Sequence, residues 1–204
     1  MVQPVNIGRI SSAKQSLNIL ERNVGDSRVV IQGRCFIENA GLWYGFEDIQ
    51  GYDPLILRRY MEYINRSQDL PPDEKVVNLH YIRNLDNHLI RMLNLEYVVA
   101  CRSQSIHKMR QALPRCYVVH QMEVKDRDVI LDVMMKDSFN PLETVVFESG
   151  RSPVNFDANE PASGAGEFCH IVRFESDSID IISNLETPGF LVLSEIEYPG
   201  WQVY

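Results

Sequence analysis

The order of helical and extended patterns changes once along the chain, and this change limits the folds that it can adopt. Within residues 1–150, β-branched runs such as Val29 to Ile31 alternate with segments whose apolar residues recur at helical spacing. A helix ending near Asn94 feeds a buried strand from Leu95 to Cys101, which is typical of an α/β layer. Residues 168–204 instead read as consecutive strands with turn residues between them.

We therefore predict an α+β fold, in which an α/β part (1–150) is followed by an antiparallel, β-sandwich-like part (168–204). Residues 151–167 are rich in Pro, Gly, Ser and Ala, and we expect them to form a linker. The segment ALPRCYVVHQMEV predicts one strand or two, with an interruption near His120. The β part is expected to be incomplete and to pack on the first part.

Bulk composition excludes several classes of protein. Of the 204 residues, 45% are apolar and 24% are charged, which is enough for a packed core. The net charge of -8 would repel a phosphate backbone, so we expect no nucleic-acid partner. No stretch reaches the roughly 18 to 20 apolar residues of a membrane span, and the N-terminus lacks the apolar core of a signal peptide. The sequence is thus expected to be soluble, either cytoplasmic or part of a larger protein whose targeting lies elsewhere.

The cysteines and histidines give no metal or cofactor pattern. The four cysteines, at positions 35, 101, 116 and 169, form no CxxC pair and have no histidine at metal spacing. Four buried thiols are the simpler interpretation, and one or two disulfides are the alternative if the domain faces an oxidising space. No HExxH or GxSxG motif occurs, and the glycines of 163–166 lack the lysine of a phosphate loop. We expect no metal, no cofactor and no catalytic residue.

Two groups of residues remain as candidate sites. Glu195 and Glu197 lie two apart on an expected strand, as a glycosidase pair might, although like charges on a solvated sheet edge are far commoner. The second group is an aromatic loop over 42–53, in which flat rings stand beside carboxylates as in sugar-binding surfaces. Its candidate ligand residues are Trp43, Tyr44, Tyr52 and Asp53, with Phe46 and Asp48 nearby. The alternative is that these rings pack the loop on the core, with Gly41, Gly45 and Gly51 permitting the turns.

Five segments, in the same order, resemble the C-terminal extracytoplasmic region of the YfhO family. They are NAGLWYGFEDIQGYDPL, LNLEYVVA with Glu96 for the family's usual lysine, ALPRCYVV with Cys116 for alanine, DSFNPLETVVFE with Asn140 for aspartate, and GFLVLSEIEYPGWQV. Together they span about residues 26–204. The signature positions that carry over are Gly51, Leu113, Pro114, Arg115, Pro199, Gly200 and Trp201, which we interpret as structural.

The resemblance implies a polytopic membrane protein of the GT-C glycosyltransferase type, which uses a lipid-linked sugar and modifies cell-envelope polymers. Its catalytic acids lie in loops between membrane helices that this sequence does not contain, so no catalytic residue is carried over. The first hypothesis is a non-catalytic domain on the extracytoplasmic face of the bacterial cytoplasmic membrane. Its partner would be the membrane-embedded part of the same protein or of a gene neighbour.

Two further hypotheses stay open, namely a free-standing carbohydrate-binding or interaction protein that uses the aromatic loop and a hydrolase built on Glu195 and Glu197. The last eleven residues, SEIEYPGWQVY, predict a Pro199–Gly200 turn followed by the start of a strand at Gln202. In the family this strand leads into a closing hairpin, so an unfilled sheet edge is expected at Tyr204.

Overall fold

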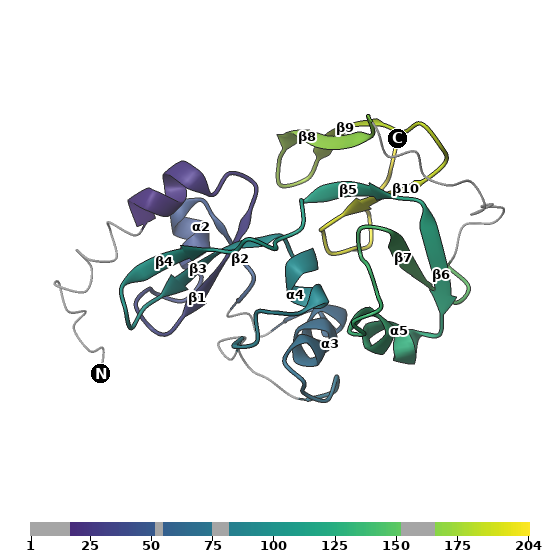
Figure 1. Ribbon diagram of the computed structural model, residues 1–204. Coiled ribbons are helices and arrows are strands. Elements are labelled where there is room, and N and C mark those ends of the chain that lie inside the picture. Colours follow the sequence, from purple (N-terminus) through teal and green to yellow (C-terminus); the bar gives the residue numbers. More distant parts are fainter. Residues whose placement is uncertain (1–16, 52–54, 75–81, 152–165) are drawn as a thin grey trace. The chain divides into compact units, whose positions relative to one another are not determined.

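The computed structural model describes residues 17–51, 55–74, 82–151 and 166–204 (Figure 1). It is an α+β protein, as predicted, with parallel and antiparallel strand pairs. The chain divides into unit 1, Met1–Leu113, and unit 2, Pro114–Tyr204. The sequence instead indicated a linker at 151–167, most of which lies outside the described residues. No helix in the described part of the chain is long and apolar enough to cross a membrane.

Unit 1 is built around a four-stranded sheet with the order β2-β1-β3-β4. β1 runs parallel to β2 and to β3, and β4 pairs with β3 in the antiparallel direction. A helical segment at residues 17–23 precedes the sheet. The other elements are β1 (Arg28–Gln32), α2 (Ala40–Tyr44), β2 (Glu47–Asp48), α3 (Arg58–Ser67), α4 (His88–Met92), β3 (Leu95–Ala100) and β4 (Ser105–Lys108).

Both faces of the two central strands are buried, which explains the apolar runs at residues 29–31 in β1 and 97–100 in β3. On one face, Val29 and Ile31 of β1 pack in a cluster that also contains Leu20 of the first helical segment. On the other face, Val30 packs with Ile64 of α3, which is fully buried, and with residues of α4. Successive residues of a strand point to opposite faces, so each central strand contributes to two hydrophobic cores. Unit 1 is therefore a three-layer α/β arrangement.

The described residues of unit 2 form three strand pairs and one helix. β6 and β7 are parallel and are joined by α5, whereas β5 pairs with β10 and β8 pairs with β9 in antiparallel fashion. The elements are β5 (Cys116–Val119), β6 (Gln121–Lys125), α5 (Arg127–Met134), β7 (Thr144–Glu148), β8 (Phe168–Phe174), β9 (Ile179–Asn184) and β10 (Phe190–Leu193). The predicted break near His120 is confirmed, since β5 ends at Val119 and β6 begins at Gln121.

The structure contains a disulfide in each unit, where the sequence favoured four free thiols. Cys35–Cys101 links the segments that follow β1 and β3 in unit 1, and Cys116–Cys169 links β5 to β8 in unit 2. No cysteine is free. The Cα atoms of the pairs lie 5.3 Å and 5.9 Å apart, within the usual range for a disulfide. The partners are 66 and 53 residues apart in sequence, so local spacing could not reveal them.

The predicted turn at Pro199–Gly200 is present, and the predicted strand after it is not. The Trp201 amide donates to the Tyr198 carbonyl at 3.2 Å, and Gly200 has a φ of 115° that favours glycine. Residues 195–204 contain no strand, and the side chains of Val203 and Tyr204 are fully exposed. The two glutamates of the hydrolase hypothesis therefore do not lie on a strand.

Candidate binding site at the carboxyl edge of unit 1

The aromatic loop is divided between core and solvent. Phe46 is 6% exposed and packs in the core, whereas Trp43 is 76% exposed and Tyr44 is 44% exposed. Leu42, beside them on α2, is 86% exposed. The core-packing alternative therefore holds for Phe46, and the rings of Trp43 and Tyr44 remain available to a ligand. Tyr52 and Asp53 lie outside the described residues.

Two glycines hold this aromatic segment in place. A Cβ atom on Gly41 would lie 2.3 Å from the Phe46 carbonyl oxygen, so only glycine lets the two segments approach this closely. Gly45 ends α2 in the left-handed region with a φ of 69°, and its amide donates to the Gly41 carbonyl. Gly51, in contrast, has an ordinary φ and no atom within 4 Å of a built Cβ. The tight return of the chain after α2 thus requires Gly41 and Gly45, and turns Phe46 inward.

A pocket of about 190 Å³ lies where β1 and β2 end. Its lining contains the apolar side chains of Ile31, Phe36 and Ile37 and the polar side chains of Arg34, Glu38, Asn39, Asp48 and Gln50. In open α/β sheets, ligands bind beyond the carboxyl ends of the strands. The sequence analysis placed Asp48 in the aromatic loop but missed Arg34 and Gln50. Arg34 comes shortly after the predicted buried strand at Val29 to Ile31, which was a signal that could have found it, whereas Gln50 lies within the predicted loop and follows no predicted strand.

Asp48 and Gln50 are fixed by each other and by β1. The Asp48 carboxylate accepts the Gln50 amide through Oδ1 at 2.8 Å, and Gln50 Oε1 accepts the Ile31 amide at 3.0 Å. Burial raises the pKa of Asp48 to about 7, and the hydrogen bond from the Gln50 amide opposes this rise. Asp48 makes no ion pair with any residue that the structure describes. Near neutral pH its carboxyl group therefore both accepts and donates hydrogen bonds.

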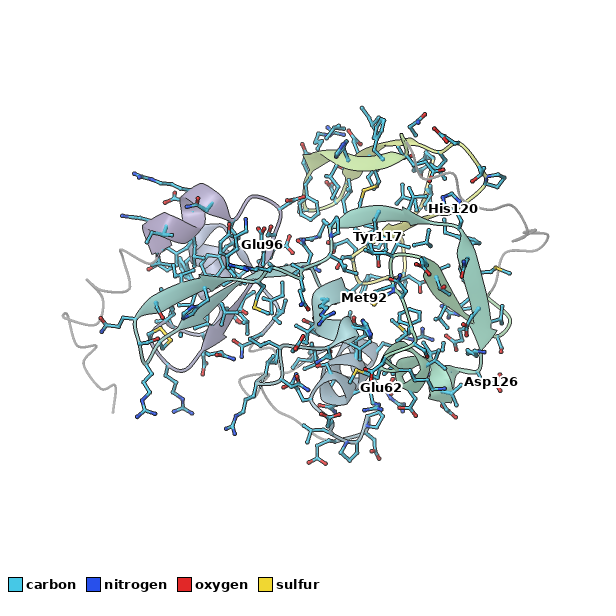
Figure 2. The ribbon with its side chains drawn as sticks, in the orientation of Figure 1. Glu62, Met92, Glu96, Tyr117, His120 and Asp126 are labelled. Carbon is cyan, nitrogen blue, oxygen red and sulfur yellow. A yellow bond between two sulfur atoms is a disulfide. The ribbon has the colours of Figure 1, made fainter. Side chains whose placement is uncertain are left out.

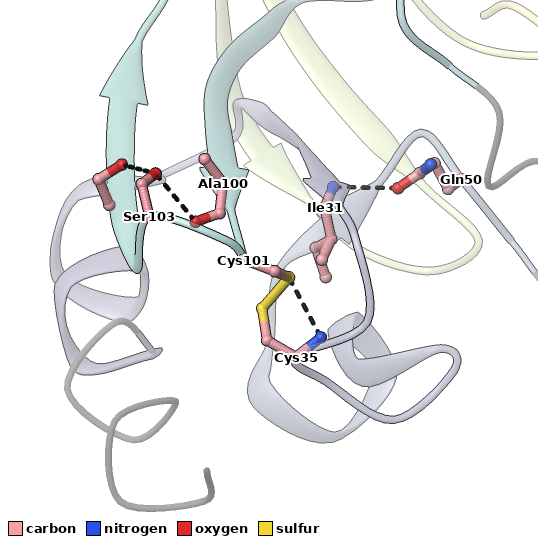
Figure 3. Close-up of a disulfide and its surroundings, with 7 residues drawn as sticks. Ile31, Cys35, Gln50, Ala100, Cys101 and Ser103 are labelled. Atoms are coloured by element: carbon pink, nitrogen blue, oxygen red, sulfur yellow. Dashed lines mark hydrogen bonds between the residues drawn. A yellow bond between two sulfur atoms is a disulfide. The ribbon is translucent and has the colours of Figure 1, made fainter.

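The first disulfide closes the sheet edge next to this pocket. The Cys35 amide donates to Cys101 Sγ at 3.1 Å (Figure 3). The Cys101 amide donates to the Gln32 carbonyl at 3.0 Å. Gly33 lies so close that a Cβ there would meet Cys101 Cβ at 2.9 Å. After β1 the chain continues to β2 on one side of the sheet, and after β3 it continues to β4 on the other side. In such α/β sheets, ligands usually bind in the crevice between two strands whose connections leave in opposite directions, here β1 and β3. Here the disulfide occupies that gap, and the pocket lies between β1 and β2 instead.

In unit 2, His120 and Glu167 form a nearly buried pair at the break between β5 and β6 (Figure 2). His120 Nε2 lies 2.7 Å from Glu167 Oε2, and its Nδ1 lies 3.0 Å from the Pro188 carbonyl. The Pro188 carbonyl and the Glu167 carboxylate raise the pKa of His120. The Glu186 amide and His120 lower the pKa of Glu167. A Cβ on Gly189 would lie 2.9 Å from His120, so the pair and the glycine together fix the loop before β10.

The Leu113–Pro114–Arg115 signature lies at the boundary of the units. The backbone of Leu113 is bound within unit 1, where its amide donates to Arg91 O and its carbonyl accepts from Asn94 Nδ2, both at 2.9 Å. Arg115 is 3% exposed and belongs to unit 2, where it pairs with Glu195 and lies 4.8 Å from the Phe174 ring centroid. Leu113 is thus bound at the end of unit 1 and Arg115 near the start of unit 2.

The proposed glutamate pair is engaged elsewhere. Glu195 pairs with Arg115, and Glu197 lies 3.3 Å from Arg151. Each carboxylate faces its own arginine, so the arrangement gives no support to a hydrolase. Among the described residues, no group of three or more His, Cys, Asp and Glu side chains could hold a metal ion. Glu96, which stands for the family's lysine, accepts from Ser27 Oγ and pairs with Lys108, both at 2.8 Å, and so has a structural role on β3.

No protein-family model, no curated protein and no solved structure matches the chain.

Proposed function

We propose that this chain is a non-catalytic extracytoplasmic module of a YfhO-like membrane protein, and that it positions an envelope glycan for the membrane-embedded part. The observation that carries the proposal is the presence of a disulfide in each unit. Disulfides persist in oxidising spaces outside the cytoplasm and are rare within it, where thiols are kept reduced. The ordered resemblance to the YfhO family supplies the rest of the assignment.

The distribution of polar groups supports a binding role. In unit 2, the charged side chains are used to fix loops and strand ends. His120 pairs with Glu167, and Arg115 pairs with Glu195. In unit 1, the exposed rings of α2 and the polar pocket lie close together in sequence, within residues 31–50. Exposed aromatic rings beside hydroxyl-binding groups are what a sugar-binding surface uses.

Thiol labelling in intact cells of the source organism tests the location. After reduction with a membrane-impermeant phosphine, a membrane-impermeant maleimide is expected to label the four cysteines of this chain within the natural protein, which should sediment with the membrane fraction. Without reduction, no labelling is expected because no cysteine is free. Labelling that requires cell lysis, or four reactive thiols without reduction, would contradict the proposal.

A second candidate function, a free-standing carbohydrate-binding protein, is favoured by the 76% exposure of Trp43. Calorimetric titration of the purified chain with envelope polysaccharide from the source organism should give binding that Trp43→Ala weakens. Trp201→Ala is the matched control, since Trp201 is also exposed (46%) but lies in unit 2. Equal affinity in wild type and Trp43→Ala would remove α2 from the binding surface. Recovery of the natural protein in the soluble fraction, with binding intact, would favour this second function over the first.

A further inference from the structure

We propose that the pocket at the ends of β1 and β2 binds a single sugar ring through Asp48, Arg34 and the apolar residues Phe36 and Ile37. This site differs from the aromatic surface of α2, which presents rings to solvent. The preference for a sugar over another small polyol rests on the proposed function. The size and polarity of the ligand are inferred from the pocket itself.

The volume of the pocket limits the ligand to about one ring. Drug-sized ligands occupy pockets of roughly 300–1,000 Å³, whereas an apolar cavity of about 150 Å³ holds one benzene molecule. At about 190 Å³, this pocket therefore has room for one six-membered ring and not for a nucleotide or a disaccharide. A longer glycan could enter only with a terminal unit.

The polar lining matches hydroxyl groups. Asp48 Oδ1 is used by the Gln50 amide, and Oδ2 bonds to no residue that the structure describes. Arg34 is exposed and makes no ion pair or hydrogen bond with any described residue. A partly protonated carboxyl group accepts and donates, a guanidinium only donates, and a sugar hydroxyl does both. A polyhydroxy ligand can therefore engage both side chains at once.

The apolar side chains that line the same pocket match the C–H groups on the face of a sugar ring. Phe36 is half-buried against the core of unit 1, and Ile37 is 57% exposed although it lines the pocket. The C–H groups on a pyranose face bury against such side chains, while its hydroxyls remain at the rim. An exposed isoleucine at the pocket mouth would lose contact with water when the ring binds.

The site is held rigid on all sides, which favours binding by reducing the ordering cost. Gln50 is tied to β1 through Ile31, and the segment after β1 is tied to β3 by the Cys35–Cys101 disulfide. Gly41 holds the start of α2 against Phe46. The two loops that supply Arg34 and Asp48 therefore cannot move apart easily.

Nuclear magnetic resonance of the purified chain, titrated with glucose, galactose, N-acetylglucosamine and glycerol, tests the proposal. At least one of the three sugars should give saturable shifts at the amides of residues 33–39 and 48–50, and glycerol should not. Asp48→Asn keeps the Oδ1 acceptor for Gln50 and removes the charge, and Arg34→Ala removes an exposed cation. Each is expected to weaken binding about tenfold, the loss of one charge-assisted hydrogen bond. Arg58→Ala, an exposed cation on α3, is the control and should leave affinity unchanged.

A second readout separates contact with Asp48 from a change in fold. Contact with ligand hydroxyls changes the hydrogen bonds and the burial of the carboxyl group, so saturating sugar should shift the pKa of Asp48 away from about 7, measured by the carboxyl carbon resonance. Absence of saturable shifts with all three sugars, or shifts that survive both variants, would overturn the proposal. A failed sugar titration would not affect the thiol-labelling prediction. Conversely, reduced cysteines in the cytoplasm would refute the proposed function without excluding sugar binding in the pocket.

Discussion

Removal of the Cys35–Cys101 disulfide should cost unit 1 a large share of its stability. The bond joins residues 66 positions apart. In the chain-entropy model, a closed loop of that length lowers the entropy of the unfolded chain by an amount worth about 4 kcal/mol at 25 °C. Whole domains are stable by only about 5–15 kcal/mol, so the double variant Cys35→Ala/Cys101→Ala should be close to the limit of folding.

Urea denaturation followed by circular dichroism measures this loss. With a slope of about 2 kcal/mol per molar urea, a loss of about 4 kcal/mol lowers the midpoint by about 2 M. The matched variant is Cys116→Ala/Cys169→Ala in unit 2, whose loop of 53 residues predicts nearly the same loss. Thiol titration of the unfolded wild type should find no free thiol before reduction and four after it.

Two results would refute this reasoning. If either double variant loses less than about 1 kcal/mol in its free energy of unfolding, the disulfides do not stabilise the chain by closing a long loop. Free thiols in the oxidised wild type would show that the cysteines are not paired. The second result would also remove the observation on which the extracytoplasmic location rests.

Three further predictions concern single positions. Gly41→Ala should destabilise unit 1 by about 1–3 kcal/mol, because the added Cβ meets the Phe46 carbonyl oxygen. The control Gly51→Ala should change the stability by no more than about 0.5 kcal/mol. Equal urea midpoints for the two variants would contradict this prediction. The His120–Glu167 pair should stabilise unit 2 most between pH 4.5 and 6.5. The stabilisation from charged His120 is lost as the pH rises through the raised pKa of this histidine in the folded state. The stabilisation from charged Glu167 is lost as the pH falls through the lowered pKa of this glutamate in the folded state. His120→Gln should flatten the decline above pH 6.5 in urea midpoints, and an unchanged profile would show that another group causes it. Arg115→Met should be tolerated far less well than Arg151→Met, because Arg115 is buried and its loss removes the guanidinium group that pairs with Glu195. Similar midpoints for the two variants would oppose this assignment.

The elements predicted correctly are those whose signal is local. Val29 to Ile31 form a strand, α4 ends at Met92 shortly before β3 begins at Leu95, and the extended run breaks at His120. Each of these follows from the spacing of apolar residues or from a turn residue within a few positions.

What the sequence could not reveal depends on contacts between distant segments. β10 pairs with β5 across about 70 positions, and the disulfides join residues 53 and 66 apart. No periodicity within either strand specifies its partner. The turn at Pro199–Gly200 was predictable from its dipeptide, whereas the lack of a strand after it depends on whether a neighbouring strand is there to pair with it.

The position of the pocket follows from the disulfide and the strand order together. In a parallel sheet with the order β2-β1-β3, the loops after β1 and β3 diverge and leave a crevice between them. Cys35–Cys101 spans that crevice, and Gly33 allows the two segments to approach until no side chain fits between them. The loop after β1 then turns over the end of β2, which brings Arg34 to the same pocket as Asp48. The pocket between β1 and β2 therefore depends on the oxidised state, and reduction of this one bond should weaken the proposed sugar binding in the titration above.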